Sequence, residues 1–118
     1  MAVIILVRRV ARADKLDAFN ESYRAERPTH EGFIAEFLTR VDTSEELPPG
    51  LRSLPLAAPG GVTFVNVAIW RSAKDFDNYF KPRAFHNPET EMEDRVRVVL
   101  DVVDGVGEVT QALLGLTA

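Results

Sequence analysis

The sequence predicts an α+β domain in which strands and helices follow one another in the order β-α-β-β-α-β. Runs rich in valine, isoleucine and phenylalanine mark four strands. Two segments between them carry apolar residues three or four positions apart, which is typical of helices packed on one side. At 118 residues the chain is large enough for one hydrophobic core but not for two, so we expect a single domain over residues 1–118.

The first strand is expected over Val3–Val10. Side chains alternate between the two faces of a strand, and residues 3–7 are aliphatic at every position, so both faces should be covered. The apolar run Ala2–Val7 is six residues long, and arginines follow it rather than precede it. It is therefore expected to be neither a signal peptide nor a membrane span.

A helix should follow the first strand. Asp14 is expected to cap it, because an aspartate side chain can accept a hydrogen bond from a free N–H of the first turn. Leu16, Phe19 and Tyr23 recur at helical spacing and should form its buried face. Pro28 should end it, since the residue before a proline avoids the helical conformation.

A second strand is expected over Phe33–Val41, after a turn that contains His30 and Gly32. Alternation separates its side chains into an apolar set and a mixed set. The apolar set consists of Phe33, Ala35, Phe37 and Val41, and the mixed set consists of Ile34, Glu36, Leu38 and Arg40.

Residues 43–61 form a long connection with four prolines and three glycines. Loops of this length without structure of their own are usually functional or disordered. Its four leucines indicate that it packs against something. Three roles stay open: a hydrophobically anchored surface loop, a lid over a pocket, or an arm in a dimer.

The third strand is expected over Val62–Trp70, where β-branched and aromatic residues dominate. Val65, Val67 and Ile69 make one face purely aliphatic, which suits packing under helices. The other face consists of Phe64, Asn66, Ala68 and Trp70. Buried amide and indole groups need hydrogen-bond partners, so this second face is expected to line a pocket that receives a ligand.

The second helix should begin at Ser72, which has Asp75 three residues later in the spacing of a capping box. Pro82 interrupts this helix. A further helical piece is then expected from Asn87-Pro88-Glu89 toward Arg95, because proline is favoured in the first helical turn. The fourth strand should lie within residues 96–103, followed by a tail over 105–118 with a short helix at 108–116.

This order of elements is the ferredoxin-like unit. Two helices can cover only one face of a four-stranded sheet, and we expect the face with Asn66 and Trp70 to be the one that is left. A second copy of the chain would cover it, so the pattern predicts a homodimer.

Composition narrows the classes of partner. The formal net charge is −4 and no basic run is longer than two residues, which argues against nucleic acid. The chain has no cysteine, so disulfides and thiolate chemistry are excluded. With no expected leader or membrane span, a cytoplasmic location is the default.

The run Asn66-Val67-Ala68-Ile69-Trp70-Arg71-Ser72, followed by a helix and by Phe85-His86 at its far end, resembles the antibiotic biosynthesis monooxygenase family of dimeric α/β barrels. The resemblance covers roughly residues 3–103. It implies a homodimer that oxidises a polycyclic aromatic phenol or anthrone to a quinone with O2, without flavin, haem or metal. A pocket tyrosine usual in that family is replaced here by Phe76, with Tyr79 one turn later.

The resemblance carries over a pocket role for Asn66 and Trp70. Asn66 would donate a hydrogen bond to the developing oxyanion, and Trp70 would stack on the ring system or donate its N–H. His86 titrates near neutrality and is the candidate base. Residues expected to contact the substrate are Phe64, Phe37, Phe76, Tyr79 and Arg83.

Other functions remain open. A polyketide cyclase or lyase would use a similar pocket, a haem-degrading enzyme would need His86 or His30 as ligand, and a binding protein would need no catalytic group. No metal site is expected, because Asp101, Asp104 and Glu108 are spaced too loosely and the two histidines lie 56 residues apart.

Overall fold

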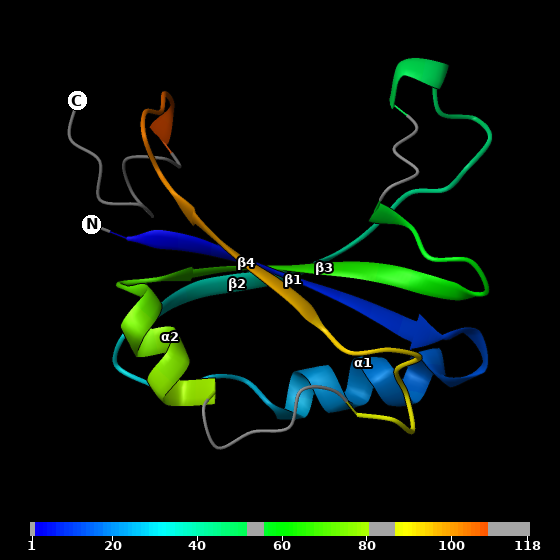
Figure 1. The fold of residues 1–118 in the computed structure, drawn as a ribbon, viewed down its shortest axis with the longest axis horizontal. Coiled ribbons are helices and arrows are strands. Elements are labelled where there is room, and N and C mark those ends of the chain that lie inside the picture. The colour runs from blue at the N-terminus through cyan, green and yellow to red at the C-terminus, as the bar shows by residue number, and fades with distance from the viewer. Residues whose placement is uncertain (1, 52–55, 81–86, 109–118) are drawn as a thin grey trace.

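A computed structural model describes residues 2–51, 56–80 and 87–108 (Figure 1). Its main elements are β1 (Val3–Arg12), α1 (Leu16–Ala25), β2 (Phe33–Arg40), β3 (Gly61–Trp70), α2 (Ala73–Phe80) and β4 (Val96–Asp101). The four strands form one sheet in the order β2-β3-β1-β4, and every neighbouring pair is antiparallel. The chain therefore has the predicted ferredoxin-like α+β fold.

Both helices lie on the same side of the sheet, whereas the long β2–β3 loop and the segment after β4 extend on the other side (Figure 1). Gly60 begins the turn into β3 with a φ of +80°, a value that glycine adopts without steric cost. At Gly61, a Cβ atom would lie 2.9 Å from the Ala11 carbonyl oxygen, so the close approach of β3 to β1 requires glycine.

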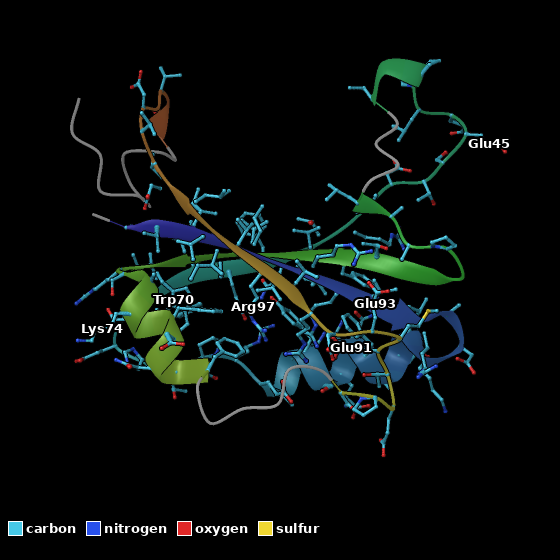
Figure 2. The ribbon with its side chains drawn as sticks, in the orientation of Figure 1. Glu45, Trp70, Lys74, Glu91, Glu93 and Arg97 are labelled. Atoms are coloured by element: carbon cyan, nitrogen blue, oxygen red, sulfur yellow. The ribbon has the colours of Figure 1, made fainter. Side chains whose placement is uncertain are left out.

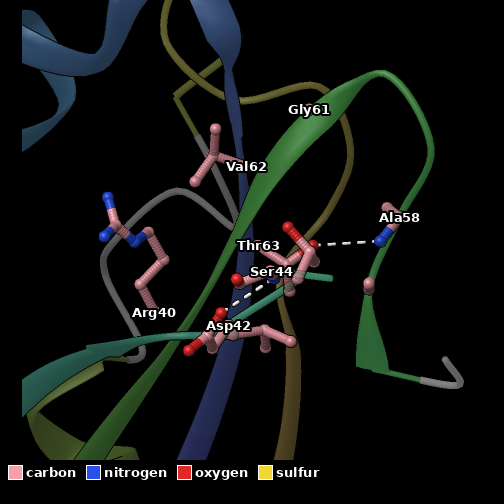
Figure 3. Close-up of a pocket in the computed structure, with 10 residues that line it drawn as sticks. Arg40, Asp42, Ser44, Ala58, Gly61, Val62 and Thr63 are labelled. Atoms are coloured by element: carbon pink, nitrogen blue, oxygen red, sulfur yellow. Dashed lines mark hydrogen bonds between the residues drawn. The ribbon is translucent and has the colours of Figure 1, made fainter. Parts of the chain in front are cut away.

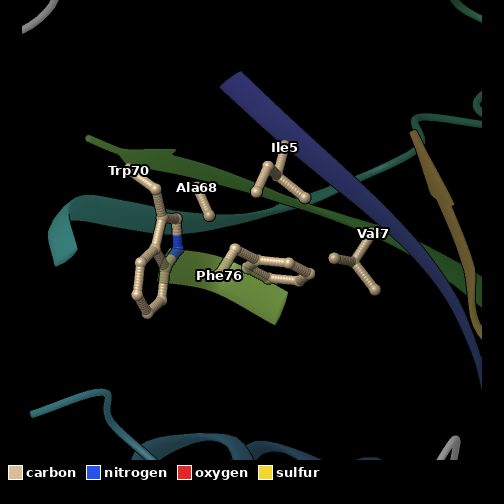
Figure 4. Packing of buried hydrophobic residues seen from close by; sticks show 5 residues of the cluster. All are labelled: Ile5, Val7, Ala68, Trp70 and Phe76. Atoms are coloured by element: carbon tan, nitrogen blue, oxygen red, sulfur yellow. The ribbon is translucent and has the colours of Figure 1, made fainter. Parts of the chain in front are cut away.

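The helices cover the face that carries Asn66 and Trp70, which corrects the sequence prediction. The register pairs Ile5 with Ala68 and Val7 with Asn66, and opposite residues of an antiparallel pair share a face. Ile5, Val7, Ala68 and Trp70 form a buried cluster with Phe76 of α2 (Figure 4). The aliphatic face with Val65, Val67 and Ile69 is consequently the one without a helix among the described residues.

A β-bulge in β2 changes the predicted division of its side chains. Phe33 pairs with Trp70, but Ala35 and not Ile34 pairs with Ile69, so one extra residue interrupts the alternation. Phe33 therefore lies on the helix side, where its ring contacts Trp70. Ala35 and Phe37 lie on the opposite side, and Glu36 lies on the helix side.

The first helix packs on the sheet through Phe19. This side chain is fully buried and its ring stacks on Phe64 of β3 with centroids 4.7 Å apart. Ala11 of β1 completes the buried part of this second cluster. The two helices thus cover different ends of one sheet face, and each packs on a separate buried cluster.

Three predictions about helix ends have different outcomes. Ser72 does cap α2, because its Oγ accepts a hydrogen bond from the Asp75 N–H at 3.1 Å. Asp14 does not cap α1; it lies inside a short 3-10 turn, and no side chain caps either element. The helical piece expected after Asn87 is also wrong, since Asn87 starts a single turn in which its carbonyl oxygen accepts from the N–H groups of Thr90 and Glu91.

The predicted terminal helix at 108–116 lies almost wholly outside the described residues. None of the helices in the described ranges is long and apolar enough to cross a membrane.

Candidate functional site

A small polar cavity lies between the sheet and the two helices. Its volume is about 40 Å³. Five elements contribute to it, with charged or polar side chains from β1, β2, β3 and α1 and aromatic side chains from α2. The lining residues are Arg9, Tyr23, Glu26, Pro28, Glu36, Asn66, Tyr79, Phe80 and Arg95. Buried polar groups are unusual under a sheet, so this cavity is the leading candidate site.

Asn66 supplies an unused hydrogen-bond acceptor at the cavity. Its side chain is 8% exposed, and its Nδ2 donates to Glu36 Oε2 at 3.2 Å. An ionised carboxylate can only accept, so this contact fixes which end of the amide is the nitrogen. The other end, Oδ1, is buried without a hydrogen-bond partner. Such an atom costs free energy unless a ligand or water donates to it.

Glu36 has a second partner in Tyr23. The Tyr23 hydroxyl forms a hydrogen bond with the Glu36 carboxylate. Burial, and then the negative charge and hydrogen bond of Glu36, raise the pKa of Tyr23 to about 12. Tyr23 is therefore a neutral donor at physiological pH, and it holds Glu36 from the helix side while Asn66 holds it from the sheet.

Glu91 joins two arginines beneath the sheet. Its carboxylate is fully buried and accepts two hydrogen bonds from Arg9, at 3.2 and 3.3 Å, and two from Arg95, both at 2.9 Å. The Asn87 backbone N–H donates a further one at 3.0 Å. Burial alone would raise the pKa of Glu91, but the hydrogen bonds from Arg95, Asn87 and Arg9 outweigh it and lower the pKa to about 2.

Charged side chains of both signs surround the cavity. Burial, and then the charge of Arg95, lower the pKa of Arg9, whose guanidinium lies 4.6 Å from the centre of the Phe19 ring. Burial also lowers the pKa of Arg97, which lies 5.4 Å over the Phe80 ring. The guanidinium groups of Arg9, Arg95 and Arg97 are thus matched in number by the carboxylates of Glu26, Glu36 and Glu91. Figure 2 shows Glu91 and Arg97 on the helix side of the sheet.

Trp70 is the centre of an aromatic cluster next to the cavity. It is 1% exposed, and rings from His30, Phe33, Phe76 and Tyr79 lie within 5.5–5.7 Å of it. Tyr79 belongs both to this cluster and to the cavity lining. Trp70 therefore contacts the cavity through Tyr79 rather than directly. His30 helps to form the turn before β2, since its Nδ1 accepts from the Gly32 N–H at 2.9 Å.

The remaining predicted site residues are dispersed. Phe64 and Phe76 are buried in the two core clusters. Phe37 is 51% exposed and lies on the opposite face of the sheet from the cavity. Arg83 and His86 lie outside the described residues. Of the predicted site residues in the described ranges, only Asn66 and Tyr79 line the cavity.

Sequence reasoning missed the charged residues of the cavity. Arg9 interrupts an apolar alternation in β1, and Glu36 does the same in β2. A charge at an inward position of such a strand is a signal for a buried polar cluster. No signal of this kind marks Glu91, which lies in a segment that was predicted to be helical.

A larger cavity of about 480 Å³ lies where the β2–β3 loop leaves and rejoins the sheet (Figure 3). Its polar groups bond to the loop itself. Asp42 Oδ1 accepts from the Ser44 N–H at 2.8 Å, and Thr63 Oγ1 accepts from the Ala58 N–H at 3.0 Å. These contacts stabilise the loop ends, and none of the buried side-chain atoms without a hydrogen-bond partner in the described residues belongs to this cavity.

No protein-family model matches the chain, and no curated protein matches it at a significant level. In the described part of the chain, no three histidine, aspartate or glutamate side chains are grouped so as to hold a metal ion.

Proposed function

We propose that the protein is a cofactor-independent monooxygenase that oxidises an electron-rich aromatic phenol or anthrone to a quinone with O2, as the resemblance to the antibiotic biosynthesis monooxygenases implies. The observation that supports this most is the Asn66 side chain. It is buried, it has an unpartnered Oδ1, and it borders a cavity with a carboxylate and aromatic walls. A hydroxyl-bearing ring satisfies all three features.

The reaction asks little of the protein beyond binding and charge stabilisation. An anthrone loses a proton to give a carbanion, which transfers an electron to O2. Recombination gives a peroxide, and its collapse leaves one oxygen atom in the new carbonyl while the other leaves as water. The guanidinium groups of Arg9 and Arg95 stabilise the anionic stages, and Tyr79 and Phe80 supply the apolar walls.

The size of the cavity sets a condition on the substrate. A volume of about 40 Å³ admits a few water molecules at most. A ring system therefore enters only if the Tyr79 and Phe80 side chains rotate away from Asn66. This condition predicts that substrate binding changes the environment of Trp70, which contacts Tyr79, and so changes the tryptophan fluorescence.

The test is oxygen consumption by the purified, metal-stripped protein with a panel of anthrones and naphthols. Uptake that equals quinone formation and persists in chelator supports the proposal. Asn66→Ala should reduce turnover at least tenfold, whereas Asn78→Ala, on the exposed side of α2, should not. Absence of uptake across the panel contradicts the monooxygenase and leaves a cyclase or a binding protein on the same fold.

The second part of the proposal is a homodimer built on the open face of the sheet. This face includes Ile4, Leu6, Phe37, Val67, Val98 and Leu100. Phe37, Val98 and Leu100 are each at least 40% exposed. A second copy offers an identical aliphatic face, and two such faces pack in an isologous, water-free contact.

Light scattering coupled to size-exclusion chromatography measures this directly. We expect a dimer at micromolar protomer concentration. A monomer at that concentration contradicts the homodimer without bearing on the cavity, which is formed within one protomer.

A further inference from the structure

We propose that Glu36 is the general base of the cavity and accepts the proton of one hydroxyl group of an aromatic ligand, while Asn66 Oδ1 accepts a hydrogen bond from a second hydroxyl group of that ligand. This inference rests on the proposed function for the identity of the ligand, but its central claim concerns proton transfer and is tested separately. It replaces His86, the candidate base from the sequence, with a residue that lines the cavity.

The geometry around Glu36 leaves its carboxylate partly unoccupied. Asn66 Nδ2 donates to Oε2, and the Tyr23 hydroxyl donates to the same carboxylate. An ionised carboxylate accepts about four hydrogen bonds, so these two donors leave room for a third. Both partners come from elements that border the cavity, and they fix the carboxylate at its wall.

The cavity lining includes two acceptors, Glu36 and Asn66 Oδ1, and two guanidinium groups. Glu36 and Asn66 Oδ1 together select a ligand that donates hydrogen bonds, which is the chemistry of a hydroxyl group and not of a bare carboxylate. Arg9 and Arg95 line the same cavity and favour a ligand that becomes negative after it binds. A phenol meets both conditions because it donates before ionisation and is an anion afterwards.

The proton transfer conserves atoms and total charge within the cavity. The O–H bond of the phenol breaks, its electron pair stays on the phenol oxygen, and the proton passes to the Glu36 carboxylate. The negative charge thus moves from Glu36 to the ligand, toward the two arginines. Tyr23 is a positioning residue, because it acts on the ligand only through its hydrogen bond to Glu36.

The experiment uses 2-naphthol, a phenol that is neutral in water at pH 7 and has a distinct absorption band when ionised. On the wild-type protein we expect bound 2-naphthol to show the naphtholate band. Glu36→Gln keeps an acceptor for Asn66 but cannot take a proton, so it should bind neutral 2-naphthol and show no band. Glu21→Gln is the matched control, because it removes an exposed carboxylate from α1 outside the cavity and should retain the band.

The pH dependence of oxygen uptake gives a second readout. The titratable and charged groups that face Glu36 are Tyr23, Glu26 and Arg27 from α1 and its end, Arg9 from β1, Tyr79 from α2, and Arg95 before β4. Glu36→Gln should lower kcat/KM by about 10²–10⁴-fold and remove the acidic limb of the profile, as expected for loss of a general base. Tyr23→Phe should shift that limb to higher pH, whereas loss of packing alone would not shift it.

The outcomes separate this inference from the proposed function. A Glu36-dependent naphtholate band without oxygen uptake supports the base and contradicts the monooxygenase. Oxygen uptake that is unchanged in Glu36→Gln supports the monooxygenase and overturns the base. A naphtholate band that persists in Glu36→Gln, or failure of the folded wild-type protein to bind 2-naphthol, also overturns the inference.

Discussion

The two faces of the sheet differ in composition, because charged side chains lie on the face that the helices bury. The face under the helices carries the buried charges, including Arg9 and Glu91, beside the aromatic cluster of Trp70. The face without a helix in the described structure is aliphatic, and Phe37 and Val98 on it are largely exposed. Buried charges thus lie beside the hydrophobic clusters inside the protomer, and aliphatic side chains are exposed on the opposite face.

This contrast indicates two separate uses of one sheet. A buried ion network costs desolvation free energy and is retained where specificity or chemistry requires it. An exposed aliphatic face of this kind favours aggregation of a monomer, but it also suits a contact with another protein. We therefore propose ligand chemistry on the covered face and association on the open face, and we expect substitutions on the two faces to impair different properties of the protein.

The largest effect is expected from Glu91→Gln on the covered face. The change leaves Arg9 and Arg95 buried without their counter-charge, which typically costs about 3–5 kcal/mol of the free energy of unfolding. Urea denaturation at a fixed protomer concentration measures it. Glu93→Gln breaks the surface pair with Arg8 and should cost at most about 1 kcal/mol, so equal losses in the two variants would contradict the special role of Glu91.

The same carboxylate predicts an acid dependence of stability. The pKa of Glu91 falls from 4.5 to about 2 on folding. A group whose pKa is lowered on folding contributes stability above its unfolded pKa and loses it as the pH falls through the folded value. The contribution should therefore be complete above pH 4.5 and disappear toward pH 2. Wild-type protein should lose more stability than Glu91→Gln across this window, and parallel pH profiles would refute the assignment.

The next largest effect is expected from Val67→Lys on the open face. A buried lysine at the centre of the proposed contact should weaken the dimer at least 100-fold, or about 2.7 kcal/mol. Sedimentation or light scattering across a dilution series measures it. Ala18→Lys, on the exposed side of α1, introduces the same charge and should leave the dimer intact. A Val67→Lys protein that stays dimeric at micromolar concentration would remove the open face as the contact.

A smaller loss is expected from Trp70→Phe, which tests the aromatic part of the covered face. The indole contacts four rings and is almost fully buried, so the smaller ring should cost about 1–3 kcal/mol of unfolding free energy. Phe37→Leu, made in the Val67→Lys monomer, should cost less than about 0.5 kcal/mol because Phe37 is exposed there. Thermal or urea unfolding of both variants measures the loss of unfolding free energy on each face.

The smallest effect is expected at the helix ends. Ser72→Ala removes the hydrogen bond to the Asp75 N–H and should cost about 1 kcal/mol. Asp14→Ala should cost less than about 0.5 kcal/mol, because Asp14 caps neither the 3-10 turn nor α1. A larger loss for Asp14→Ala than for Ser72→Ala would contradict both cap assignments.

The sequence by itself determined the order of the elements and most of their bounds. Periodicity distinguishes a strand from a helix because the two have different repeats, and this information is local. It located β1, β3 and α2 to within two residues, and it identified Asn66 as a polar residue on an otherwise apolar strand. It also correctly predicted that Glu36 and Phe37 lie on opposite faces of the sheet, because alternation holds on the later part of β2.

Only the tertiary structure decided which sheet face meets the helices and which polar residues meet each other. Alternation divides a strand into two sets, but on β1 and β3 both sets are largely apolar, so choosing the purely aliphatic face of β3 as the one under the helices was wrong. The bulge at residues 33–35 also moves Phe33 to the face of Trp70. The contacts of Asn66 with Glu36, and of Arg9 with Glu91, join residues 30 and 82 positions apart. They exist because strand register brings distant residues together, and no local pattern encodes that register.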